Sequence, residues 1–367
     1  MIYFLVNNNY HVHLDMQLVK KLSNFELSLI QIPYSLNIIK ESDVFSNIYT
    51  YEERLITSLK NIFFKPSNLK NILRRVDETL FPDQADILFV HTDMDILNQY
   101  IIQKFYECRA KVYLIEDGIA TITQFNMEEK TAEFKDNLRC FFLKYIYGFK
   151  YLKIIKYGVM TQPVMEDFVF RGVLINYGDT IKRKIPLYKL ISDQKQIEVA
   201  YEKGAIFFNQ PLYLFYMSEG EFLAYIENFL IASHNFSHFY FKFHPSDSES
   251  FKASVFNLIE NKFKNITIIL EDNIAEEIVY KYAVRYVITI SSTSAFNLMN
   301  SGVVPIFTNN MLSKLYPNDN FSAFSQFLKS IDCYAPIEVS EIKPGFCAFS
   351  NTKNDENRYS IVDIINK

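Results

Sequence analysis

Short apolar runs alternate with segments of helical period along most of the chain. The runs that predict buried strands lie at 2–6, 86–90 and 111–115 in a first half, and at 205–208, 239–243, 266–270 and 286–290 in a second. Strands buried on both faces of a sheet have continuous apolar sequences, and their alternation with helices is typical of parallel sheets. The pattern therefore predicts an α/β protein with two parallel sheets.

The chain has 367 residues, which fits two domains better than one core. Between the halves, residues 161–199 lose both periods and become polar, and they contain Pro163, Gly172 and Gly178, so we predict a linker there. The expected organisation is a Rossmann-like domain at 1–160, the linker, a second Rossmann-like domain at 200–340, and a tail at 341–367 that crosses back to the first domain. Two Rossmann-like domains facing across a cleft form the GT-B architecture, although a fold alone does not fix a function.

Composition and charge restrict the possible partners and the compartment. A net charge of −4 and a pI near 5.9 argue against a nucleic-acid-binding protein, which would carry a basic face. The four cysteines lie far apart, so neither a zinc site nor a disulfide framework is indicated. The first residues lack the basic region of a signal peptide, and no segment reaches the roughly 18 apolar residues of a membrane span. We therefore expect a cytoplasmic protein, either free or peripheral on the cytoplasmic face of the inner membrane.

Two adjacent carboxylates, Glu116 and Asp117, follow the predicted strand 111–115, and Gly118 allows a tight turn after them. A carboxylate at the carboxyl end of a strand is well placed to accept a proton from a hydroxyl nucleophile. The alternative is a solvated turn, because Asp-Gly is a common turn dipeptide.

A histidine and a proline end the strand in the segment FYFKFHPSDSE, residues 239–249. Pro245 removes a donor from the strand ladder, and Ser246 with Glu249 has the spacing of a capping box that opens a helix. His244 is then expected at the carboxyl end of a strand, where open α/β sheets bind ligands. It is a candidate general acid, or a cation for a leaving phosphate; the alternative is a histidine that only satisfies a strand end.

Small hydroxyl residues end the predicted strand at 286–290 and precede a helix that Gly302 should cap. Ser291, Ser292 and Thr293 could donate hydrogen bonds to a phosphate there, although such residues are also ordinary helix caps. Asn209, directly after the strand at 205–208, is placed with these donor-binding candidates. The acidic residues that follow the strand at 266–270 are candidates for a ribose diol or are solvated helix-start carboxylates: Glu271, Asp272 and Glu277.

Three short motifs occur in a fixed order: Glu116–Gly118, His244–Pro245 and Ser291–Ser292. This order resembles the bacterial GT-B sialyltransferases, in particular the lipooligosaccharide and capsule sialyltransferases of glycosyltransferase family 52 and the related polysialyltransferases. The resemblance leaves about the first 80 residues of the chain unmatched.

The resemblance implies inverting transfer of a nonulosonic acid, usually N-acetylneuraminate, from a CMP-linked donor to a glycan or glycolipid acceptor, without a metal or other cofactor. It implies Asp117 as the general base for the acceptor hydroxyl, with Glu116 as the less favoured candidate. His244 corresponds to the group that protonates or neutralises the departing CMP phosphate, and Ser291 and Ser292 to its hydrogen-bonding partners. Glu277 corresponds to the glutamate that holds the ribose.

A D-x-D pattern, Asp93 and Asp95, is a metal-binding signature in glycosyltransferases of another fold. Because Thr92 and Asp93 also suit the cap of the following helix, we favour a structural role for the pattern.

The segment 135–158 has six basic residues and one acidic residue among many aromatic ones. A basic aromatic helix could lie on anionic lipid, or it could pack its apolar face on its own domain.

Two rival functions remain open. A CDP-glycerol or CDP-ribitol phosphotransferase also has a K-x-H-P motif, matched here by Lys242 to Pro245. A non-catalytic capsule-assembly subunit could bind a nucleotide at the same strand ends without reacting, but it would have no use for the carboxylate pair.

Overall fold

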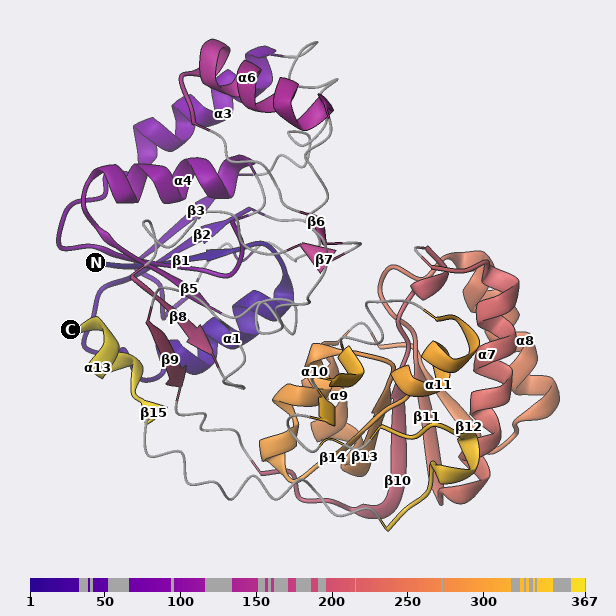
Figure 1. The fold of residues 1–367 in the computed structure, drawn as a ribbon. Helices are drawn as coiled ribbons and strands as arrows, with labels where there is room; N and C mark the ends of the chain where they lie inside the picture. Colours follow the sequence, from indigo (N-terminus) through magenta and orange to yellow (C-terminus); the bar gives the residue numbers. More distant parts are fainter. Residues whose placement is uncertain are drawn as a thin grey trace. The chain divides into compact units, whose positions relative to one another are not determined.

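The computed structural model divides the chain into two compact units, which are described separately (Figure 1). Unit 1 comprises Met1–Ser192 and Glu356–Lys367, and unit 2 comprises Asp193–Asp355. The structure describes residues 1–32, 39, 42–51, 66–93, 96–115, 134–150, 156–157, 160–161, 171–175, 186–190, 196–214, 216–271, 273–317, 324–326, 328–329, 333, 335–345 and 358–366.

Unit 1 is built on a parallel sheet whose described strands run in the order β15-β9-β8-β5-β4-β1-β2-β3. The strands are β1 (Ile2–Val6), β2 (Leu27–Gln31), β3 (Asn47–Thr50), β4 (Ile87–Val90), β5 (Lys111–Ile115), β8 (Gly172–Ile175), β9 (Leu187–Leu190) and β15 (Arg358–Tyr359). The chain moves outward from β1 to β3 and then returns to the other side of β1 with β4. The carboxyl ends of β1 and β4 thus form a topological switch point, the usual ligand position in such sheets.

Helices cover both faces of this sheet (Figure 1). They are α1 (Asn9–Val19), α3 (Pro66–Thr79), α4 (Ile96–Glu107), α6 (Phe134–Tyr147) and α13 (Ile361–Ile365). Alternate residues of β1 serve the two faces: Tyr3 packs its ring 4.9 Å from Phe105 of α4, whereas Phe4 belongs to the core that α1 and α13 cover. Burial on both faces explains the continuous apolar sequence of β1. A separate antiparallel pair joins β6 (Lys156–Tyr157) to β7 (Met160–Thr161).

Unit 2 has a second parallel sheet, with the order β12-β11-β10-β13-β14. Its strands are β10 (Tyr201–Phe208), β11 (His238–Lys242), β12 (Ile266–Ile269), β13 (Val284–Thr289) and β14 (Val304–Phe307). The order again reverses beside the first strand, between β10 and β13, as in a Rossmann-like domain. The prediction of two parallel-sheet Rossmann-like domains is confirmed.

The helices of unit 2 also lie on both faces of its sheet (Figure 1). They are α7 (Glu219–Leu230), α8 (Glu249–Lys262), α9 (Ala275–Tyr282), α10 (Thr293–Asn297) and α11 (Asn309–Leu315). Much of the core is aromatic: Phe207 of β10 contacts Phe229 of α7 and Phe241 of β11, with ring centroids 4.4 and 5.4 Å apart. Gly302 has a φ of +85°, the left-handed conformation that the expected helix cap requires.

The segment predicted as a linker, 161–199, differs from that expectation. It contains β8 and β9, which extend the sheet of unit 1 beside β5, and the two units divide between residues 192 and 193. Each of these strands has only four residues, too few to produce a recognisable period. The expected C-terminal tail began at residue 341; residues 356–367 lie in unit 1, where β15 pairs with β9.

Candidate functional site

The candidate site lies at the carboxyl edge of the sheet in unit 2. Asn209 and Gln210 follow β10, His244 follows β11, and Ser291 follows β13. Because β11 and β13 flank β10, the two outer loops leave the sheet about 10 Å apart, twice the usual strand spacing. The end of β10 and its loop lie between them, at the edge where Rossmann-like sheets bind ligands.

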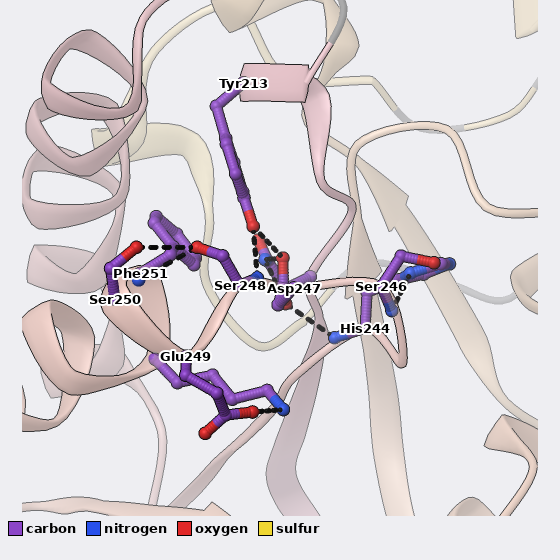
Figure 2. A network of polar contacts seen from close by, with 10 residues as sticks. Tyr213, His244, Ser246, Asp247, Ser248, Glu249, Ser250 and Phe251 are labelled. Atoms are coloured by element: carbon purple, nitrogen blue, oxygen red, sulfur yellow. Dashed lines mark hydrogen bonds and ion pairs between the residues drawn. The ribbon is translucent and has the colours of Figure 1, made fainter.

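A buried carboxylate, Asp247, holds the loop that contains the His-Pro pair (Figure 2). Its Oδ2 accepts a hydrogen bond of 2.7 Å from the backbone N–H of His244 and one of 2.8 Å from the side-chain amide of Asn209. The Tyr213 hydroxyl donates to Oδ1 at 3.4 Å and accepts from the backbone N–H of Ser248 at 2.7 Å. Asp247 therefore fixes the backbone of His244, and Asn209 and Tyr213 hold Asp247 in place.

The helix after this loop begins later than the sequence suggested. The N-cap of α8 is Ser248, whose hydroxyl accepts from the backbone N–H of Phe251 at 3.1 Å, so the predicted capping box of Ser246 and Glu249 is wrong. Ser246 instead donates its backbone N–H to the Nδ1 of His244 at 3.1 Å. A turn, closed by the bond of 3.0 Å from Asp247 N–H to the His244 carbonyl, separates the strand from the helix.

The ring of His244 has a defined tautomer in its neutral form. Because Nδ1 accepts a hydrogen bond, the ring proton lies on Nε2, which is then a donor. Burial lowers the pKa of His244 below its ordinary value of 6.5; the charge of Lys242 adds to this shift, and that of Asp247 opposes it. In the unliganded protein at pH 7, His244 is therefore a neutral hydrogen-bond donor.

A pocket of about 290 Å³ adjoins this ring between the ends of β11 and β12. Its lining combines cationic, aromatic and acidic side chains: Lys242, Phe243, His244, Pro245, Lys252, Phe256, Ile269, Leu270 and Glu271. Lys242 is 7% exposed, and its Nζ donates to the backbone carbonyl of Glu271 at 2.9 Å, which ties the loop after β12 to β11. A cationic pocket with apolar walls suits a planar group joined to an anion.

Of the three candidate ribose ligands, Asp272 lies outside the described residues, and the other two lie in different surroundings. Glu271 lines the pocket beside His244 and accepts from Lys281 at 2.6 Å and from the Tyr282 hydroxyl at 3.2 Å. Glu277 is exposed on α9 and accepts from Asn273 at 3.0 Å. The structure thus brings Glu271, and not Glu277, to the pocket that His244 lines.

The loop after β13, which contains Ser291 and Ser292, is contacted by a residue that the sequence analysis did not identify. The Oε1 atom of Gln210 accepts from the backbone N–H of Ser291 at 2.5 Å and lies 3.3 Å from its hydroxyl. Ser292 is the N-cap of α10 and accepts from the backbone N–H of Ser294 at 3.3 Å. Thr293 is the first residue of α10. An oxygen already fills the position to which Ser291 donates, so an incoming phosphate oxygen would have to displace Gln210.

Asn209 supports this arrangement, because its side-chain amide donates to both oxygens of the Asp247 carboxylate, at 3.1 and 2.8 Å. Its position directly after a strand was the only signal in the sequence. Gln210 is one residue further from the strand, and neither it nor Asp247 or Tyr213 had such a signal, since their partners come from other elements of the fold.

In unit 1, the two candidate general bases, Glu116 and Asp117, lie outside the described residues. In the sequence they come directly after the last residue of β5.

Of the D-x-D pattern, Asp93 is described and fully buried, and Asp95 is not described. The helix α4 is described from Ile96, and residues 94–95 before it lie outside the described part of the chain, so the predicted cap at Thr92 and Asp93 stays a prediction. Among the described residues, no three His, Cys, Asp or Glu side chains form a group that could hold a metal ion.

Replacing Asp247 by asparagine should destabilise unit 2 by about 1–3 kcal/mol, because an amide would face the donors that now share a carboxylate. Burial already raises the pKa of Asp247, so the loss arises from the missing acceptor rather than from the charge. Urea denaturation provides the measurement. Glu249→Gln, at the first residue of α8, is the matched control: its side chain is 89% exposed, and we expect a change within about 0.5 kcal/mol. Equal stability of both variants would contradict the assigned role of Asp247.

Comparison with known proteins bears on the fold. The sequence matches no protein-family model, and no curated protein matches it. The chain is similar to UDP-GlcNAc 2-epimerase from Methanocaldococcus jannaschii, with 10% identity, a TM-score of 0.50 and coverage of 100% of this chain and 99% of that one. It is also similar to a protein assigned as a UDP-N-acetylglucosamine 2-epimerase from Listeria monocytogenes, with 10% identity, a TM-score of 0.50 and coverage of 90% and 87%.

A UDP-glucosyltransferase from Polygonum tinctorium is similar at 10% identity and a TM-score of 0.48, over 93% of this chain and 87% of that one. At these identities a likeness concerns the fold alone. Two Rossmann-like units with parallel sheets are consistent with the likeness to the Methanocaldococcus jannaschii epimerase, which covers 100% of this chain. The protein has a GT-B fold.

Proposed function

We propose that the protein is an inverting sialyltransferase. It would move a nonulosonic acid, N-acetylneuraminate, from a CMP-linked donor to a terminal sugar hydroxyl, that of a galactose, on a bacterial surface glycan such as lipopolysaccharide, lipooligosaccharide or capsule. The GT-B fold is compatible with this reaction, and the ordered motifs Glu116–Gly118, His244–Pro245 and Ser291–Ser292 support it. The partners are then a CMP-nonulosonate and a glycan or glycolipid.

The proposal rests mainly on the protonation and the position of the His244 ring. Its Nε2–H is a donor at the edge of a pocket that also contains Lys242 and Lys252. A CMP leaving group has a single phosphate, so the negative charge that develops on it is modest. One histidine donor with nearby cations and hydroxyls is sufficient to stabilise that charge. No divalent cation is needed in this account.

The remaining groups have complementary roles in the proposal. Glu271, in the same pocket, supplies acceptor oxygens for a ribose diol. Ser291 would donate to the phosphate once Gln210 is displaced. Asp117, with Glu116 beside it, would remove the proton of the acceptor hydroxyl; this role rests on the motif and on the position of the pair directly after β5.

One observation keeps a second function in view. Lys242, the first residue of the K-x-H-P motif, lies in the same pocket as His244, as a CDP-glycerol or CDP-ribitol phosphotransferase would also require. The two functions differ in the product: the phosphotransferase forms a phosphodiester, whereas the sialyltransferase forms a glycoside of a nonulosonic acid.

The test is a screen of the purified protein against CMP-, CDP- and UDP-activated donors with simple galactosides as acceptors. Release of the free nucleotide and the mass of the product are measured with and without EDTA. We expect CMP release and a glycoside product with CMP-nonulosonates, unchanged by EDTA. Turnover of CDP-glycerol or of UDP-sugars alone would contradict the proposal. Loss of activity in EDTA with rescue by Mg²⁺ would return Asp93 and Asp95 to the mechanism.

A further inference from the structure

The helix α6 of unit 1 exposes large apolar side chains. Phe141 is 54% exposed, Tyr145 66% and Ile146 41%, whereas Leu143 is fully buried. Phe141 and Tyr145 are four residues apart and therefore lie on one face of the helix, roughly opposite Leu143. Figure 1 draws α6 beyond α4, on the far side of that helix from the sheet of unit 1. Ile146 lies about 140° around the helix from Phe141, so we call Phe141 and Tyr145 alone the α6 patch.

The rings of the α6 patch form part of a continuous aromatic surface. The ring centroids of Phe141 and Tyr145 are 4.5 Å apart, and those of Phe141 and Phe142 are 5.5 Å apart. Two large aromatic side chains exposed together on one helix face, Phe141 and Tyr145, are unusual. Exposed apolar residues on a protein surface are normally scattered singly. The patch therefore indicates an interaction surface.

The opposite side of α6 already anchors the helix to its unit. The buried Phe149, just after the helix, donates its N–H to the carbonyl of Leu143 at 3.2 Å and places its ring 5.4 Å from that of Tyr100 in α4. Leu143 is fully buried. Substitutions in the outward-facing patch should therefore leave the fold intact.

Charge distinguishes the possible partners of this patch. The segment 135–158 carries six basic residues and one acidic residue, in a chain with a net charge of −4. Lys144 is exposed on the helix, with its Nζ 5.4 Å from the centroid of the Tyr145 ring. Aromatic residues flanked by basic ones are typical of helices that lie in the interface of an anionic bilayer. A second copy of this chain also has a net negative charge, but it is a less specific partner for the basic segment than an anionic bilayer is.

We propose that α6 docks unit 1 on an anionic phospholipid surface, with Phe141 and Tyr145 inserted at the level of the head groups. Insertion of the rings supplies the apolar contribution, and the exposed Lys144 and Lys150 confine binding to anionic lipid. Among the described residues, no helix is long and apolar enough to cross a membrane. The inference does not depend on the donor chemistry proposed above.

The chain contains no tryptophan, so one introduced indole reports on its own surroundings. The full-length Tyr145→Trp variant is titrated with vesicles of phosphatidylcholine alone or mixed with phosphatidylglycerol. We expect a blue shift of emission, and quenching by brominated acyl chains, only with the anionic vesicles. Phe81→Trp is the matched control, because Phe81 is 73% exposed in unit 1 outside α6, and its emission should not change. An equal response of both variants would overturn the proposal.

Co-sedimentation with the same vesicles gives a second measurement. Replacing Phe141 and Tyr145 together by serine should weaken binding to anionic vesicles by about tenfold or more, whereas Phe81→Ser should bind as the unmodified protein does. Binding should also fall at high salt. Absence of binding by the unmodified protein, or equal binding by the double variant, would contradict the proposal. A concentration-dependent dimer that the double variant abolishes, without lipid binding, would instead make the patch an interface between copies.

Discussion

Replacing His244 by alanine should lower kcat by about 100-fold to 10,000-fold, the range typical of a positioned proton donor. The reason is the place of the ring: Nδ1 is fixed by the N–H of Ser246, and Nε2–H remains to meet the departing phosphate. A donor with a better leaving group should recover part of the loss, because its departure depends less on hydrogen bonding or protonation. Steady-state rates over a series of leaving groups provide the measurement.

The substitution His244→Gln refines this experiment. A glutamine amide retains a neutral donor but cannot transfer a proton, so partial activity would assign His244 the role of a hydrogen-bond donor, and complete loss would assign it proton transfer. If His244 merely satisfies a strand end, His244→Ala should lose thermal stability while its folded fraction turns over normally. That outcome would show the catalytic role to be wrong.

Replacing Asp117 by asparagine should also lower kcat by about 100-fold to 10,000-fold, because the acceptor hydroxyl would lose its base. This variant should gain nothing from a better leaving group, since its defect lies on the acceptor side of the reaction. Rates of Asp117→Asn and His244→Ala with the same donor series measure the difference. Identical responses of the two variants would mean that the roles are assigned wrongly.

Two controls accompany the Asp117 variant. Glu116→Gln should have the smaller effect on kcat, because the second acid of the motif is the expected base. CMP binding should be unchanged in Asp117→Asn, since the nucleotide is assigned to unit 2. An inactive variant with normal CMP binding would also argue against a non-catalytic assembly subunit, for which the carboxylate pair has no purpose.

The sequence predicted the central strands well because they are buried on both faces. The strands β1 and β5 begin and end at the expected residues, and each lies inside its sheet, where an apolar run cannot be interrupted without cost. The strands β2, β3 and β14 were missed, although β2 is fully buried and lies inside its sheet. The strand β14 contains Pro305, which usually argues against a strand and is tolerated here because β14 is at the edge of the sheet.

The chain path at the domain boundary was the least predictable part of the fold. The strands β8, β9 and β15 have only four, four and two residues, and β15 pairs with β9 from a distant part of the chain. Such strands form because a sheet edge is already present, which is a tertiary effect that local patterns do not contain.

The site was predictable in its residue types but not in its connections. A polar residue directly after an apolar strand was sufficient to identify His244, Ser291 and Asn209 as candidates. The partners of these residues were not predictable, because the bonds of Asp247 to Asn209 and of Gln210 to Ser291 cross between loops that meet only in the folded sheet.

The central claim, that a CMP phosphate binds beside the ring of His244, is tested most directly by NMR titration of the histidine ring protons. The chain has six histidines, and His244→Gln identifies the resonance that belongs to His244. In the free protein its pKa should lie below 6.5, because burial disfavours the charged ring. Saturation with CMP should raise that pKa, since an adjacent anion stabilises the imidazolium. If CMP fails to bind, or binds and leaves the titration of His244 unchanged, the phosphate does not lie beside His244.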